Sequence, residues 1–131
     1  MRFAMPNHPF DFEIPDAWLE GKDLTRPRAE GCAYRTANEA TLVALQVIEP
    51  PRRNPWVPLD WRGFSKERFH AVLARMLGDQ VLDPVPAFAL PRPERPPYPY
   101  EYRTADGYHR FFASIAAGFT HLPCNVLRQS D

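Results

Sequence analysis

The sequence predicts a small α/β (α+β) domain, in which a small mixed sheet is combined with two main helices. Two segments, 65–77 and about 107–117, carry apolar residues at helical spacing. Short apolar or β-branched runs lie before, between and after them. The chain has 131 residues, of which 44% are hydrophobic, and this is the size of one ordinary domain with its own core. We expect one compact domain overall, with an N-terminal arm at 1–40 and the folded core at 41–131.

The arm is predicted to be irregular and polar. Asp16 is expected to cap a short helix that ends at Gly21, because aspartate accepts from free backbone N–H groups and glycine adopts the left-handed conformation of a helix end. Trp18 is the residue that would anchor this arm to the domain.

The first strand and the first helix are the clearest elements. Residues 41–48 (TLVALQVI) are a nearly continuous apolar run that predicts a buried strand, ended by Pro50 and Pro51. In 65–77, Ser65 is the expected N-cap and Gly78 the expected C′ residue. One helical face collects Phe69, Val72, Leu73, Met76 and Leu77. His70 lies beside this face and is predicted to be a boundary residue rather than a ligand.

The second half alternates strands with a helix. Residues 85–90 and 100–104 are expected strands, and the five prolines within 91–99 exclude a regular element between them. That segment is predicted to be an exposed, stiff loop. The helix 107–117 ends at Gly118, and a last strand covers 121–127.

Bulk composition sets the class of protein. The formal net charge is zero, from 16 basic and 16 acidic residues, so the basic face typical of a nucleic-acid binder is missing, although a local basic patch remains compatible with this balance. No apolar run reaches the ~20 residues of a membrane span, and a cytoplasmic location is therefore expected. Cys32 and Cys124 have no neighbouring cysteine, which predicts two structural thiols and no metal cluster.

One turn carries groups suited to chemistry. Asp106-Gly107-Tyr108-His109-Arg110 lies where a strand becomes a helix, and a helix N-terminus attracts anions. Gly107 would allow close approach of the backbone to a ligand, Arg110 offers a cationic fork, and His109 donates or transfers a proton near neutral pH. Asp106 would cap the helix, hold His109 or help to bind a metal. Spacing alone equally fits a capped helix with surface side chains.

The wider sequence resembles the ParB/sulfiredoxin superfamily. The similarity rests on Thr104–Ala113, which contains the aspartate-glycine-x-histidine-arginine turn, and on Ala117–Val126 with its glycine and its Leu-Pro strand start. The first half, from Leu42 to the strand start at Asp83-Pro84-Val85-Pro86, is similar in a more generic way. The resemblance covers roughly 41–127 and implies a ParB/sulfiredoxin-like fold.

The resemblance also implies a ligand site. In several branches of the superfamily this turn binds the phosphates of a nucleotide, so the ligand-binding residues would be Gly107, Tyr108, His109, Arg110, Arg52 and Arg53. The catalytic residues would be Asp106, His109 and Glu49, the last by its position at the end of the first strand. The implied ligand is a nucleotide, with Mg²⁺ as a companion ion, or another phosphate-containing small molecule. Hydrolysis of the phosphate compound is the implied reaction.

The sequence departs from two branches of the superfamily and leaves other functions open. Tyr108 stands where sulfiredoxins have their reactive cysteine, which argues against sulfinate reduction. The helix-turn-helix region of partitioning ParB proteins has no counterpart in this sequence. A non-catalytic module that binds a protein partner through the arm and the proline-rich loop is one alternative. Nuclease or DNA-modification work is a second alternative, which the neutral charge disfavours.

Overall fold

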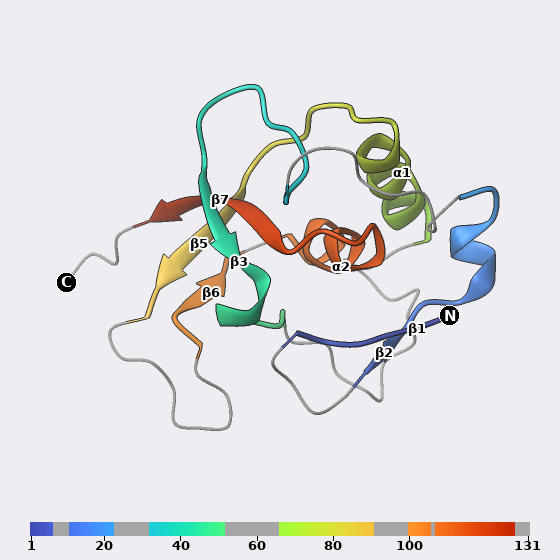
Figure 1. Cartoon of the computed structure of the whole chain (residues 1–131), viewed down its shortest axis with the longest axis horizontal. Coiled ribbons are helices and arrows are strands. Elements are labelled where there is room, and N and C mark those ends of the chain that lie inside the picture. The colour runs from blue at the N-terminus through green and yellow to red at the C-terminus, as the bar shows by residue number, and fades with distance from the viewer. Residues whose placement is uncertain (7–10, 23–31, 52–65, 91–99, 106, 128–131) are drawn as a thin grey trace.

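The computed structural model describes residues 1–6, 11–22, 32–51, 66–90, 100–105 and 107–127 (Figure 1). Its order of elements is β1 (Arg2–Phe3), β2 (Phe12–Glu13), the 3₁₀ turn η1 (Asp16–Leu19), β3 (Thr41–Ala44), the 3₁₀ turn η2 (Leu45–Val47), β4 (Ile48–Glu49), α1 (Lys66–Leu77), β5 (Val85–Ala89), β6 (Tyr102–Thr104), α2 (Tyr108–Ala116) and β7 (His121–Leu127). The predicted α+β class, a mixed sheet with two main helices, is confirmed. The proline-rich loop 91–99 and the N-cap Ser65 lie outside the described residues.

The main sheet has five strands in the order β3-β7-β5-β6-β4. β3 with β7 and β5 with β6 are antiparallel, whereas β5 with β7 and β4 with β6 are parallel. The register sets Val43 opposite Leu122 and Val85 opposite Cys124, and all four side chains are buried. On the opposite face Leu42 and Leu127 are exposed. Burial alternates along the first residues of β5, whereas β7 has three buried residues in succession, at 122–124, followed by three exposed ones.

The predicted strand 41–48 is interrupted, and the interruption curls the sheet. β3 and β4 lie at opposite ends of the strand order, yet only the three residues of η2 separate them. Four Cα steps reach at most about 14 Å, while four strand spacings in a flat sheet measure about 19 Å. The Leu45 amide donates to the Thr120 carbonyl ahead of β7, and the Val47 carbonyl accepts from the Glu101 amide ahead of β6. The two edges of the sheet therefore meet at η2, in the manner of a partly closed barrel.

The two helices pack against each other and bury their apolar faces (Figure 1). In α1, Phe69, Leu73 and Met76 are buried, as the helical spacing predicts. The predicted end of this helix is displaced by one residue: the left-handed conformation is at Asp79 and not at Gly78, whose amide still bonds back to the Ala74 carbonyl. Aspartate tolerates this conformation better than most residues.

Residues of the predicted arm belong to the same core. β1 and β2 form a short hairpin, and Phe12 packs edge-to-face on Phe112 of α2 with ring centroids 5.0 Å apart. Trp18 lies 5.9 Å from Phe69, which confirms it as an anchor. The short helix expected after Asp16 is the turn η1, but its N-cap is Pro15 rather than Asp16. The arm is less irregular than its sequence suggests, because several of its described apolar residues are buried in the core: Phe12, Ile14, Trp18, Leu19 and Tyr34.

Candidate functional site

Gly107 begins α2 in a left-handed conformation, with φ of 102°. It is buried, and a Cβ added at this position would meet Cγ1 of Val85 at 2.8 Å, closer than real Cβ contacts allow. Both the positive φ and the lack of space demand glycine here. Gly107 therefore packs closely on Val85, the first residue of β5. The approach of a ligand to its backbone stays a prediction.

Arg110 joins the first turn of α2 to the segment that enters β5. Its Nη1 donates to the carbonyl oxygens of Asp83 at 3.1 Å and Pro84 at 3.0 Å. The same Asp83 carbonyl accepts a hydrogen bond from the Tyr34 hydroxyl at 2.7 Å. The predicted fork of Arg110 is thus partly engaged inside the protein, which leaves only part of its N–H set for a ligand.

Two buried titratable side chains, Tyr34 and Cys124, lie near Arg110. Burial raises the pKa of Tyr34 well above its ordinary value, and the nearby Arg110 charge partly opposes that effect. Burial likewise raises the pKa of the Cys124 thiol to about 11, again with Arg110 acting in the opposite direction. A thiol held in its neutral form is a poor nucleophile, and Cys124 fits the structural role predicted for it.

Thiol reactivity should separate the two cysteines. In the native protein at pH 8, Ellman's reagent is expected to label Cys32, which is half-buried, and to leave Cys124, which is 1% exposed, until the chain unfolds. The thionitrobenzoate released in buffer measures the accessible thiol, and the further release in denaturant measures the buried one. A Cys32→Ser variant should lose the native reaction, and a native reaction that persists in it would contradict the burial of Cys124.

Glu49 forms an ion pair across the parallel strands β4 and β6. Its Oε2 accepts from Nη2 of Arg103 at 2.9 Å and from Nε at 3.2 Å, and the two residues are register partners. The Glu49 side chain is 12% exposed and that of Arg103 is 52% exposed. Glu49 therefore lies beside the strand that leads into the 106–110 turn, but with its carboxylate committed to a partner that sequence reasoning missed.

The predicted site residues are only partly placed. His109 is half-buried in the first turn of α2. Asp106, Arg52 and Arg53 lie outside the described residues, as does the Tyr108 side chain. Tyr34 and Arg103 join the described residues around the turn, although no motif marked them. Tyr34 falls in a segment read as irregular, and its partner is a backbone carbonyl, which leaves no trace in side-chain patterns. Within the described parts of the chain, no three histidine, cysteine or acidic residues are grouped to hold a metal ion.

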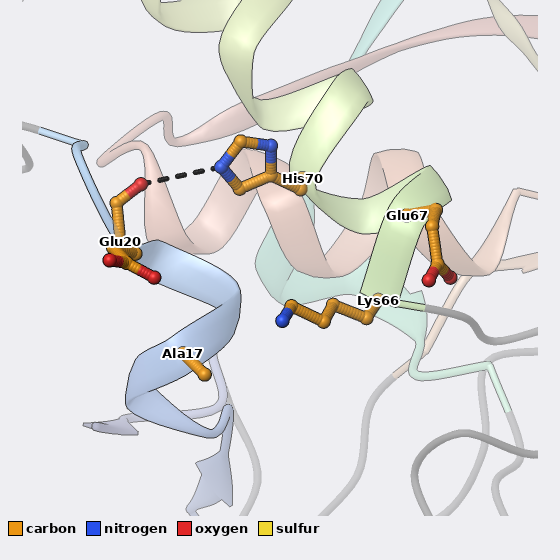
Figure 2. A pocket seen from close by; sticks show the side chains of 5 residues that line it. All are labelled: Ala17, Glu20, Lys66, Glu67 and His70. Carbon is orange, nitrogen blue, oxygen red and sulfur yellow. Dashed lines mark hydrogen bonds between the residues drawn. The ribbon is translucent and has the colours of Figure 1, made fainter.

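A hollow of about 320 Å³ lies elsewhere, between η1 and the first turns of α1 (Figure 2). Its lining carries both signs of charge: Ala17, Glu20, Lys66, Glu67 and His70. Nε2 of His70 lies 3.3 Å from the Glu20 carbonyl oxygen, so this histidine links the arm to α1 at the edge of the core. The boundary role predicted for His70 is confirmed. The residues that line this hollow come from η1, the residue after it and α1, and the described residues of the 106–110 turn are not among them.

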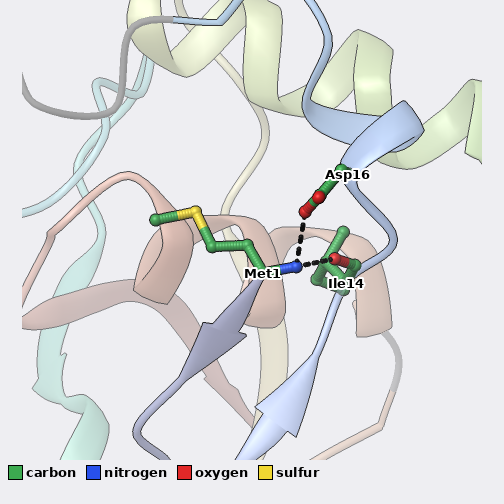
Figure 3. A network of polar contacts seen from close by, with 3 residues as sticks. All are labelled: Met1, Ile14 and Asp16. Atoms are coloured by element: carbon green, nitrogen blue, oxygen red, sulfur yellow. Dashed lines mark hydrogen bonds and ion pairs between the residues drawn. The ribbon is translucent and has the colours of Figure 1, made fainter.

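The hairpin of the arm is closed by polar contacts at Met1 (Figure 3). The α-amino nitrogen donates to the Ile14 carbonyl at 2.6 Å and to Oδ1 of Asp16 at 2.8 Å, while the Ile14 amide donates to the Met1 carbonyl at 2.9 Å. Asp16, expected as a helix cap, uses its carboxylate here instead. With Phe12 and Trp18 buried, this part of the arm is packed on the domain.

Comparison with known proteins gives a partial structural likeness and no sequence match. No family model matches the chain, and no curated protein matches its sequence. A similar solved structure is that of the C-terminally truncated chromosome-partitioning protein ParB from Caulobacter crescentus, complexed to the centromeric parS site. The identity is 23%, over 70% of this chain and 41% of that chain, with a TM-score of 0.43. The match spans about two fifths of that chain. Among the described elements, neither helix is both long and apolar enough to cross a membrane.

Proposed function

We propose that this domain binds a phosphate-containing ligand at the start of α2. The observation that carries the proposal is the charge pattern of the first turn. Gly107 is the N-cap and has no side chain that carries a charge, and the first turn of α2 contains no acidic residue. His109 and Arg110 instead stand at the positive end of the helix dipole, where cations are unfavourable and an anion is stabilising.

The ligand contacts assigned by the proposal follow from this geometry. Arg110 uses Nη1 on the Asp83 and Pro84 carbonyls, so its Nε and Nη2 groups are those assigned to the anion. His109 is assigned a second hydrogen bond, and Tyr108, Arg52 and Arg53 complete the proposed contacts. A nucleotide with Mg²⁺ is the proposed ligand class, since its phosphates match a helix N-terminus with a cationic fork.

Hydrolysis of that ligand is the second part of the proposal. Asp106 and His109 would exchange protons with the reacting phosphate and its water, as general acid–base residues do. Glu49 would take part only after release from Arg103, because a paired carboxylate is a weaker base. Binding and hydrolysis are therefore separate claims, and binding is tested first.

The test is calorimetric titration with pyrophosphate, ATP and CTP, each with and without Mg²⁺. The wild type should bind at least one of them at millimolar concentration or below. Arg110→Gln should weaken binding by roughly 1.5–3 kcal/mol, the range for a hydrogen bond to a charged group. The matched control is Arg75→Gln, since Arg75 on α1 also donates to a backbone carbonyl, that of Val81. Unchanged binding is expected for the control.

Two further outcomes would redirect the assignment. If the wild type binds none of these compounds, the phosphate site is wrong and the protein-interaction alternative gains ground. If short duplex DNA binds and the nucleotides do not, the DNA-associated alternative replaces it. Phosphate release by the wild type, lost in Glu49→Gln and His109→Gln, would establish hydrolysis.

A further inference from the structure

The segment 82–84, which precedes β5, is hydrogen-bonded to three other residues: Arg35, Tyr34 and Arg110. Leu82 donates its amide to the Arg35 carbonyl at 2.9 Å. Asp83 accepts from both the Tyr34 hydroxyl and Arg110, and Pro84 accepts from Arg110 as well. These bonds tie the segment 34–35, the segment 82–84 and the first turn of α2 into one unit, here called the clasp and defined by Tyr34, Asp83, Pro84 and Arg110.

The hydrogen bonds of the clasp would be costly to break. Tyr34 is 4% exposed, so its hydroxyl would be costly to bury without its acceptor. The Asp83 carbonyl has two lone pairs, and Tyr34 and Arg110 supply a donor for each. One of these donors is a cation, which makes its bond stronger than a neutral one. Loss of the Tyr34 hydroxyl would therefore loosen the same carbonyl that Arg110 holds.

The clasp also acts on the glycine that starts α2. The residue that follows Pro84 is Val85, whose side chain occupies the space that a Cβ on Gly107 would need. Movement of Asp83 and Pro84 would thus shift Val85 against Gly107. Arg110 holds the same first turn from its other end. The first turn of α2 is therefore held at two points, Gly107 and Arg110. Both contacts depend on the position of residues 83–84.

We infer that Tyr34 is a positioning residue for the start of α2, acting through the Asp83 carbonyl and Arg110. It touches no ligand. The effect of Tyr34 on ligand affinity rests on the proposed function. Its effect on how rigidly the first turn of α2 is held does not. Arg110 accordingly has two tasks, since one side of its guanidinium holds the protein and the remaining N–H groups are those assigned to the anion.

The first arm of the test is amide hydrogen exchange without ligand. The probes are the amides of Ala105 and Phe111, which flank the turn and donate to the Pro86 and Gly107 carbonyls. Tyr34→Phe removes only the hydroxyl and should speed exchange at both probes. Tyr100→Phe is the matched control, because Tyr100 is a second buried tyrosine, 3% exposed, and precedes β6 at the end away from the turn. If the exchange rates at both probes are unchanged in Tyr34→Phe, the inference that the clasp holds the turn is wrong.

The second arm measures pyrophosphate affinity by calorimetry at a temperature where every variant is folded. Tyr34→Phe should weaken binding about 3- to 10-fold, the effect of one hydrogen bond, and Tyr100→Phe should not. In an Arg110→Gln background the effect of Tyr34→Phe should vanish, because the two residues act on one carbonyl. Equal loss in both backgrounds, or faster exchange with unchanged affinity, overturns the positioning role. If the wild type binds no pyrophosphate, the proposed function fails. The exchange experiment then still tests whether the clasp holds the first turn of α2.

Discussion

Replacing Phe69 with alanine is expected to lower the free energy of unfolding by ~3–5 kcal/mol. The side chain is fully buried in α1 and stands 5.9 Å from the Trp18 ring. Its removal leaves a cavity at the junction of α1 with the arm, and the residues around it can close that space only in part. Urea unfolding followed by tryptophan fluorescence and by circular dichroism measures the change.

The Phe69→Ala experiment has a control on the same helix. Glu67 is exposed in the first turn of α1, and Glu67→Ala should change stability by no more than ~0.5 kcal/mol. Comparable effects of the two substitutions would mean that the α1 face does not form the core. Transitions that differ between fluorescence and circular dichroism would show that unfolding is not two-state.

Gly107→Ala should destabilise the protein by ~2–5 kcal/mol, through two separate causes. A left-handed backbone costs a non-glycine residue ~1–2 kcal/mol, and forcing a methyl group into a filled space costs ~1–3 kcal/mol. The added methyl group would stand 2.8 Å from Cγ1 of Val85. Chemical denaturation with constant m-value is the appropriate measurement.

Gly118 provides the comparison that separates these causes. It ends α2 with φ of 90°, and a Cβ there would have no neighbour within 4 Å. Gly118→Ala should therefore show the backbone term alone. The excess at Gly107 should shrink when Val85 is also replaced by alanine, since the collision is then removed. An equal effect at the two glycines would refute the tight packing of Gly107 on β5.

The periodic elements of the fold could be predicted because their residues face the core in a regular order. Phe69, Leu73 and Met76 are buried at the spacing that the helix demands, and β7 has the bounds expected for it. The break at Leu45–Val47 could not be predicted, because the apolar run 41–48 has the same composition whether it forms one strand or two. Which sheet edge each half joins depends on β6 and β7, far along the chain.

The place of the 106–110 turn in the fold could be predicted, but the contacts of its residues could not. The glycine and the two basic residues of the turn do lie at the start of α2, as the strand-to-helix transition implies. The sequence did not show that Val85 occupies the space over Gly107, nor that Arg110 holds the Asp83 and Pro84 carbonyls. Backbone acceptors carry no residue-type signature, so such contacts appear only in three dimensions.

The junction at η2 has a consequence for how this protein can vary in length. Loops normally tolerate insertions and deletions, because their ends are free to adjust. Leu45–Val47 cannot adjust, since it is hydrogen-bonded toward β7 at one end and toward β6 at the other. One residue more or fewer would turn Ile48, which is fully buried, to the opposite face of β4, and one residue fewer would bring Glu49 to its place. The number of residues in this stretch is therefore fixed by the fold, and related chains that keep the fold should keep three residues here.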